Sequence, residues 1–359
     1  MVSWMHLTDG GGIMTDRLQK TDLKNMTRDE LKNHMKQLGF PAFRGEQIFT
    51  WIHTTATEFE QMTNLPQKLR EQLSEECKIT CHEIVTVQSS KTDGTKKYLF
   101  RLEDGNTIES VFMKYKFGNS ICVSTQAGCR MGCRFCASTI GGLCRNLTAA
   151  EILEEVLAVQ RDTGERISHI VLMGSGEPFD DYDNVTKFLE LVHDPKGLNL
   201  SLRNITLSTC GILPNMKRFG DEFPQVNLAV SLHASNSELR STLMPINKKY
   251  PMEELMEVCR EHVQKTGRRI TFEYTLVKGV NDKDENLNQL TRLLSGMNCH
   301  VNLIPMNPVS ERDLKGTDRR FAEEFCKKLE KKGIQATVRR ELGSDIDAAC
   351  GQLRLNSQK

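Results

Sequence analysis

The chain has 359 residues, of which 38% are hydrophobic and 26% charged, and its formal net charge at pH 7 is +1. This composition is typical of a globular protein with room for one large domain and one smaller domain. A net charge this close to zero gives the protein no general attraction to polyanions. No apolar run approaches the ~18 residues of a membrane-spanning helix, so we expect a cytoplasmic protein that does not contact a membrane.

The amino-terminal part of the chain predicts a tail followed by a small helical domain. Residues 1–20 are polar and contain several glycines, and we expect them to form a flexible tail because they lack the apolar core of a signal peptide. Residues 21–78 predict the helical domain. Thr27 and Glu30 have the spacing of a capping box at the start of its first helix, and a second helix is expected over residues 44–52.

Over residues 79–118 the pattern changes from a helical period to alternation of apolar and polar residues. The alternating stretches are separated by Asp93-Gly94 and Asp104-Gly105. An Asp-Gly pair between such stretches is a strong signal for a tight hairpin turn. We therefore predict a β-ribbon extension between the helical domain and the rest of the chain.

Strand and helix patterns alternate over residues 119–340. Strands are expected at residues 121–125, 169–173, 204–209, 226–232, 270–277, 300–304 and 336–339. Alternation of this kind predicts a parallel sheet with right-handed crossovers, and the repeats are too few for a closed eight-fold barrel. The predicted fold class is α/β, a partial (βα)6-type barrel with its site at the carboxyl ends of the strands. Residues 341–359 follow this core as a separate carboxyl-terminal segment.

Three of the twelve cysteines stand close together in a glycine-containing loop, Cys129, Cys133 and Cys136. Three thiolates from one loop can bind three irons of a cubane cluster and leave the fourth iron open to a ligand. Two other interpretations remain: a zinc site with a distant fourth ligand, and buried structural thiols. Zinc knuckles usually pair two C-x2-C units, and this chain contains no second one.

Small polar residues follow several of the predicted core strands. A glycine-rich turn with Gly176 and Glu177 ends the second strand, and the later strand ends carry Ser208, Ser231, His233 and Asn307. Each of these residues taken alone is more typical of a turn than of a ligand site. Because the carboxyl ends of parallel strands meet at one rim, we expect the set to face a common ligand.

The chain resembles the RlmN/Cfr family of radical S-adenosylmethionine (SAM) RNA methyltransferases. The resemblance covers nearly all of the chain beyond residue ~20. It is carried by residues 43–51, 122–145, 174–178, 226–247, 299–308 and 339–353. It implies a radical SAM partial barrel with a [4Fe-4S] cluster on Cys129, Cys133 and Cys136. It also implies the SAM contacts Gly176, Glu177, Ser208, Ser231, Leu232, His233 and Asn307.

The resemblance further implies two catalytic cysteines and two SAM molecules per turnover. Cys350 would receive a methyl group from one SAM, and a radical generated from the second SAM would abstract hydrogen from that methyl. The methylene would then add to an adenine carbon. Cys122 would remove the ring proton and release the base by forming a disulfide with Cys350. Glu109 is the third catalytic residue that the resemblance implies, and it would bond the edge of the target adenine or assist proton transfer.

The implied substrate is C2 of an adenine in 23S ribosomal RNA, and in certain transfer RNAs, with the helical domain as an RNA-binding attachment. An external electron donor such as flavodoxin or ferredoxin would reduce the cluster, and we expect a monomer. A cluster of basic residues is expected to contact phosphates. These are Lys96, Lys97, Arg101, Lys114, Lys116, Arg130, Arg134, Arg145, Arg339 and Arg340.

Three alternatives stay open at this point. The first is a Cfr-type enzyme that methylates adenine C8 and gives antibiotic resistance. The second is a non-catalytic RNA-binding protein with a structural zinc. The third is another radical SAM activity, such as a glycyl-radical activase, against which the pair Cys122 and Cys350 argues.

Overall fold

The computed structural model describes residues 20–54, 56–306, 312–343 and 345–346. Most of the expected tail, together with Asn307 and Cys350, lies outside the described residues. Within the described part of the chain, none of the helices is both long and apolar enough to cross a membrane.

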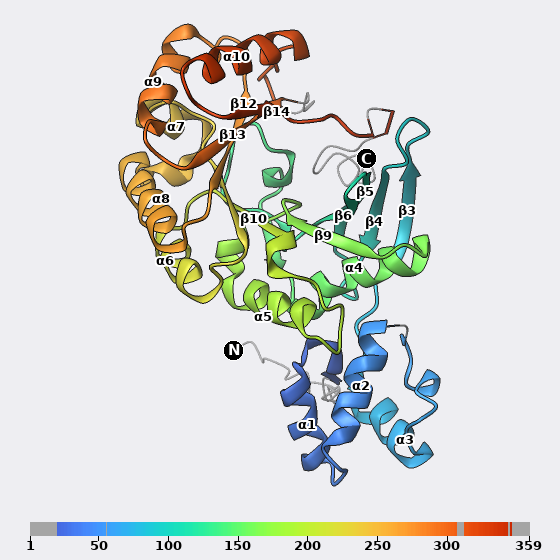
Figure 1. The fold of residues 1–359 in the computed structure, drawn as a ribbon. Helices are drawn as coiled ribbons and strands as arrows, with labels where there is room; N and C mark the ends of the chain where they lie inside the picture. The colour runs from blue at the N-terminus through green and yellow to red at the C-terminus, as the bar shows by residue number, and fades with distance from the viewer. Residues whose placement is uncertain (1–19, 55, 307–311, 344, 347–359) are drawn as a thin grey trace, which may run out of the picture.

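The amino-terminal unit contains three helices, α1 (Arg28–Gln37), α2 (Phe43–Thr54) and α3 (Gln67–Glu76). The predicted capping box at the start of α1 is present, with Thr27 accepting from the amide of Glu30 and Glu30 accepting from the amide of Thr27. Two short parallel strands close the unit, β1 (Thr21–Asp22) and β2 (Cys77–Lys78). Figure 1 shows these helices together at one end of the molecule.

A ten-stranded sheet is the centre of the rest of the described fold, with its strands in the order β14-β13-β12-β11-β10-β9-β6-β5-β4-β3. The parallel strands are β6 (Gly118–Val123), β9 (Ile167–Leu172), β10 (Ile205–Thr209), β11 (Asn227–Ser231), β12 (Ile270–Leu276), β13 (Cys299–Pro305) and β14 (Ala336–Val338). The antiparallel strands β3 (Glu83–Ser89), β4 (Lys96–Arg101) and β5 (Thr107–Tyr115) continue the sheet beyond β6. The predicted ribbon is therefore joined to the core through β5 and β6.

Over the described residues, seven α-helices connect the parallel strands. They are α4 (Ala149–Thr163), α5 (Tyr182–His193), α6 (Leu213–Glu222), α7 (Ser237–Leu243), α8 (Met252–Thr266), α9 (Asp284–Leu294) and α10 (Arg319–Lys331). Figure 1 shows them along the outer side of the curved sheet. Because β3 and β14 each pair on one side only, the barrel stays open, which confirms the predicted partial barrel.

A segment after β14 connects the two edges of the open sheet. We call residues 339–346, of which 344 is not described, the strap. The amide of Gly343 donates to Asp93 Oδ2 (2.9 Å), and the amide of Lys91 donates to Asp345 Oδ2 (2.9 Å). Asp93 and Lys91 lie in the β3–β4 hairpin, so the strap reaches from one edge of the sheet to the other side (Figure 1).

Candidate active site

A cavity of about 580 Å³ lies inside the partial barrel, with the strap forming part of its wall. It is lined by thiols, by polar residues from the strand ends and by cations. The residues among these that carry the argument are Cys122, Cys129, Cys133, Cys136, Gly176, Glu177, Ser208, Cys210, Ser231, His233, Glu273, Arg339 and Arg340. Most of the residues predicted to contact the cluster and SAM therefore line one cavity.

Backbone geometry holds the loop with the three cysteines in place. The short strands β7 (Gln126–Gly128) and β8 (Leu143–Asn146) pair at its base, and the amide of Cys129 donates to Gly142 O (3.0 Å). Gly128 has a φ of +86°, and a Cβ there would lie 2.1 Å from Gly142 O. Only glycine fits this position, so the close approach that forms the loop depends on it.

The three thiols fit an iron–sulfur cluster better than a single metal ion. Burial raises the pKa of Cys129 to about 12 and that of Cys133 well above its ordinary value. Among the described residues, no three His, Cys, Asp or Glu side chains converge on one ion-binding point. A cubane cluster needs each thiolate on a separate iron, and the shared cavity provides space for a ligand on the fourth.

His233 and Phe135 form the boundary between the cysteine loop and the barrel interior. Their rings meet edge to face with centroids 4.6 Å apart. Burial lowers the pKa of His233 to about 3, and its Nδ1 accepts from the amide of Thr275 (2.9 Å). The imidazole is therefore neutral and carries its proton on Nε2, so it can donate a hydrogen bond but cannot supply a charge.

Glu177 lines the cavity while its carboxylate is bonded to the neighbouring strand. It accepts from Thr209 Oγ1 (2.6 Å), from the amide of Cys210 (2.7 Å) and from the amide of Phe179 (3.1 Å). Burial raises its pKa despite these donors. The residue thus connects the glycine-rich turn after β9 to the end of β10.

The remaining predicted residues fall in different places. Cys122 lies on β6, opposite Val111 of β5, and lines the cavity. Leu232 is fully buried and does not line it. Glu109 is buried on β5, outside the cavity lining, and forms an ion pair with Lys97 (3.0 Å). Contact between Glu109 and a base stays a prediction.

Two buried residues near the cysteine loop were not found by sequence reasoning. Cys210, at the end of β10, lines the cavity and packs in the same apolar cluster as Cys133. Arg240 on α7 has no exposed surface and donates to Cys210 O (2.7 Å) and Ser231 O (3.1 Å). Only the register of β10 and β11 brings these groups together, so no local pattern could have indicated them.

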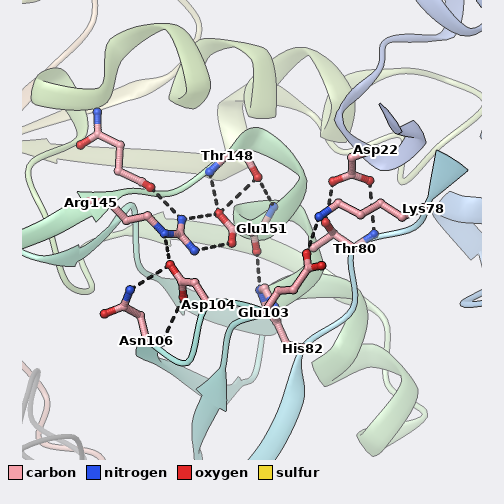
Figure 2. A network of polar contacts seen from close by, with 11 residues as sticks. Asp22, Lys78, Thr80, His82, Glu103, Asp104, Asn106, Arg145, Thr148 and Glu151 are labelled. Atoms are coloured by element: carbon pink, nitrogen blue, oxygen red, sulfur yellow. Dashed lines mark hydrogen bonds and ion pairs between the residues drawn. The ribbon is translucent and has the colours of Figure 1, made fainter. Parts of the chain in front are cut away.

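The predicted phosphate-binding cluster is largely neutralised by acidic partners. Arg145 forms ion pairs with Asp104 and Glu151 (Figure 2). Lys97 is fully buried, so its assignment to a phosphate-contacting surface is wrong. Carboxylates also pair with four further members, Lys96, Arg101, Lys114 and Arg130. Lys116, Arg134, Arg339 and Arg340 are exposed, and the last two line the cavity.

Family models match both the amino-terminal helical unit and the barrel of this chain. The Radical SAM superfamily matches residues 123–290, and the ribosomal RNA large subunit methyltransferase N-terminal domain matches residues 21–79. A solved radical SAM methyltransferase from Sphaerobacter thermophilus superimposes with a TM-score of 0.89 at 43% identity, covering 92% of this chain and 98% of that one.

Two curated relatives carry the name probable dual-specificity RNA methyltransferase RlmN. The protein from Lachnospira eligens is 56% identical over 335 residues, covering 93% of this chain and 96% of that one. The protein from Geobacillus kaustophilus is 53% identical over 339 residues, covering 93% of each. The fold and the site define a radical SAM methyltransferase, an enzyme that uses a [4Fe-4S] cluster and SAM. Within that class, the chain belongs to the RlmN family.

Proposed function

We propose that this enzyme methylates C2 of an adenine in 23S ribosomal RNA and in certain transfer RNAs, through a methylated Cys350. The single observation that carries the proposal is that Cys122 lines the same cavity as the three cysteines of the loop. The names and coverage of the curated relatives support the RNA substrate. When bound, the cluster supplies the electron that cleaves SAM and so produces the radical chemistry.

The residues of the cavity would divide the remaining work. Cys129, Cys133 and Cys136 would hold the cluster, and the polar strand ends with Gly176, Glu177, Ser208, Ser231 and His233 would hold SAM. Neutral His233 suits a hydrogen bond to an uncharged group of that ligand. Leu232, which is buried next to Ser231 and His233 and does not line the cavity, would support these two SAM contacts by packing. The expected contact from Asn307 lies outside the described residues.

Cys122 would act on the base after the carbon–carbon bond forms. After the adduct has given up its unpaired electron to the oxidised cluster, the Cys122 thiolate would take the ring proton. The sulfur of Cys122 would then bond to the sulfur of Cys350, and the bond between the Cys350 sulfur and the methylene carbon would break. The carbon would gain the proton, so that the methylated base leaves and a disulfide remains. Two electrons from outside must reduce this disulfide before the next turnover, and a flavodoxin or ferredoxin would supply the separate electron for the cluster. Cys350 itself lies outside the described residues.

Replacing Cys122 tests this division of roles. In Cys122→Ala the base should remain covalently attached to the protein, because the group that resolves the adduct is gone. We expect an RNA–protein adduct on a denaturing gel after anaerobic incubation with a 23S fragment, SAM and a reductant. Cys81→Ala, which removes an exposed thiol distant in sequence from the loop, is the control and should release methylated RNA. Free methylated RNA from Cys122→Ala would contradict the proposed role.

A further inference from the structure

An exposed aromatic residue lies at the turn between β5 and β6. Phe117 has 66% of its surface exposed, more than Phe43 and Ile84, the other two large exposed apolar residues in the part of the chain that the structure describes. Its ring lies nearly parallel to that of Tyr115, with centroids 4.9 Å apart and an interplanar angle of 10°. His169 of β9 meets it edge-on, with centroids 5.0 Å apart.

The position of Phe117 is set by its surroundings. Gly118 has a φ of +135°, and a Cβ there would lie 2.2 Å from Ser168 Oγ, so the turn is held tightly against β9. Ser168 Oγ also bonds Asn119 O (3.0 Å) and the ring of His169 (2.9 Å to Nδ1). The contacts with Tyr115 and His169 fix the ring while most of its surface remains in solvent.

Tyr115 connects this exposed ring to the cavity. It lines the cavity together with Val111 and Met113 of the same strand, and its hydroxyl donates to Met113 Sδ (3.7 Å). Burial raises the pKa of Tyr115, while the nearby cations Arg339 and Arg340 of the strap act in the opposite direction. An aromatic path therefore leads from the cavity wall to the surface, beside the cations of the strap.

We propose that Phe117 is a stacking platform for an unpaired base that neighbours the target adenine in the RNA. This inference rests on the proposed function, because it assumes that an adenine enters the cavity. An adenine that leaves its stack to enter the cavity deprives its neighbours of a stacking partner. Phe117, whose ring packs on the cavity-lining Tyr115, would replace that partner, and any of the four bases can stack on such a ring.

Charge favours RNA over an apolar partner at this surface. Lys116, adjacent to Phe117, is exposed, and so are Arg339 and Arg340. Arg339 and Arg340 are close enough to act on Tyr115, the ring on which Phe117 stacks. Cations near aromatic rings are typical of surfaces that bind single-stranded nucleic acid, because the backbone phosphates flank each stacked base. An apolar protein partner would instead bury these charges at a cost.

Phe117→Ala and Phe117→Trp test the platform. The probe is a 23S rRNA fragment that carries 2-aminopurine in turn at the two positions flanking the target adenosine. We expect Phe117→Ala to bind this RNA about tenfold more weakly, since stacking on one aromatic side chain has an effect of this order. Phe117→Trp should restore the affinity, and its indole should quench the 2-aminopurine at one flanking position. Ile84→Ala, at an exposed apolar residue of β3, is the matched control and should bind like the wild type.

Two further measurements, SAM cleavage without RNA and methylation of the fragment by the wild type, complete the test. The first shows whether Phe117 only supports the fold, and the second shows whether the proposed function itself is correct. SAM cleavage without RNA should be the same in the wild type and in Phe117→Ala, because Phe117 does not line the cavity and is not among the residues that would hold SAM. An equal loss of SAM cleavage would mean that Phe117 supports the fold, and the platform would be rejected. If the wild type methylates the fragment and Phe117→Ala binds it equally well, only the platform fails. If the wild type neither binds nor methylates the fragment, the proposed function fails, and this inference fails with it.

Discussion

Arg240 connects the ends of two neighbouring strands beneath the cysteine loop. Its guanidinium donates to Cys210 O and Ser231 O, and also to Asn247 Oδ1 (3.0 Å). Asn247 in turn donates to Ser241 Oγ (2.8 Å) on the helix that carries Arg240. The position of the loop depends on this region, since the amide of Arg134 donates to Leu243 O (2.9 Å).

Replacing Arg240 by methionine should destabilise the protein strongly. Methionine fills similar space but donates no hydrogen bond, so three acceptors lose their donor, two of them in fully buried bonds. We expect a loss of ~3 kcal/mol in the free energy of unfolding, measured by urea titration. Arg320→Met is the control, because the Arg320 side chain is 89% exposed, and its effect should stay within about 0.5 kcal/mol. Equal urea midpoints for the two variants would show that the buried bonds do not contribute to stability.

At the scale of elements, two aspartates hold the strap against the β3–β4 hairpin, Asp93 from the hairpin and Asp345 from the strap. We call the bonds of Asp93 to Gly343 and of Asp345 to Lys91 the latch. Burial acts to raise the pKa of Asp93, but donors in Gly343, Thr95 and Ser90 outweigh it and lower the pKa to about 2. The latch is thus formed by an ionised carboxylate at neutral pH.

The sign of the pH dependence follows from this lowered pKa. A carboxyl group whose pKa is lower in the folded protein than in the unfolded chain stabilises the folded form at every pH above the unfolded pKa. This stabilisation is lost as the pH falls through the folded pKa. The latch should therefore be complete above about pH 4 and weaken toward about pH 2.

Asp93→Ala tests the latch at neutral pH. We expect the amide of Gly343 to exchange with solvent about tenfold faster, because its acceptor is removed. Asp104→Ala, in the β4–β5 hairpin, removes a similar carboxylate without touching the strap, and the exchange of Gly343 should not change. Equal exchange in Asp93→Ala and the wild type would mean that other contacts hold the strap.

At the scale of the whole molecule, a buried ion pair joins the amino-terminal unit to the barrel. Lys24, just before α1, forms an ion pair with Glu154 of α4, and both side chains have no exposed surface. Its ammonium also donates to Thr80 O (2.5 Å), in the connection to β3. Burying two charges is tolerated only where both are paired, so this contact fixes the two parts of the chain against each other.

The order of strands and the cysteine loop could be predicted because both depend on local patterns. The spacing of Cys129, Cys133 and Cys136 lies within one loop, and the Asp-Gly pairs mark the hairpins that the structure contains. The burial of Lys97 could not be predicted, because its partner Glu109 lies on the next strand and only the register reveals the pair. The same holds for the packing of Cys210 beside Cys133 and for the contact of Phe117 with His169, because in each pair the two residues are distant in sequence.

The most direct test of the account is the identity of the methylated nucleoside. The cluster-loaded protein would be incubated without oxygen with a 23S rRNA fragment, SAM and a reductant, and the RNA would be digested and analysed by mass spectrometry against nucleoside standards. The proposed function predicts 2-methyladenosine, which should be absent with Cys350→Ala. Production of 8-methyladenosine would contradict the assigned carbon, and intact SAM cleavage without any methylated adenosine would contradict the assigned substrate.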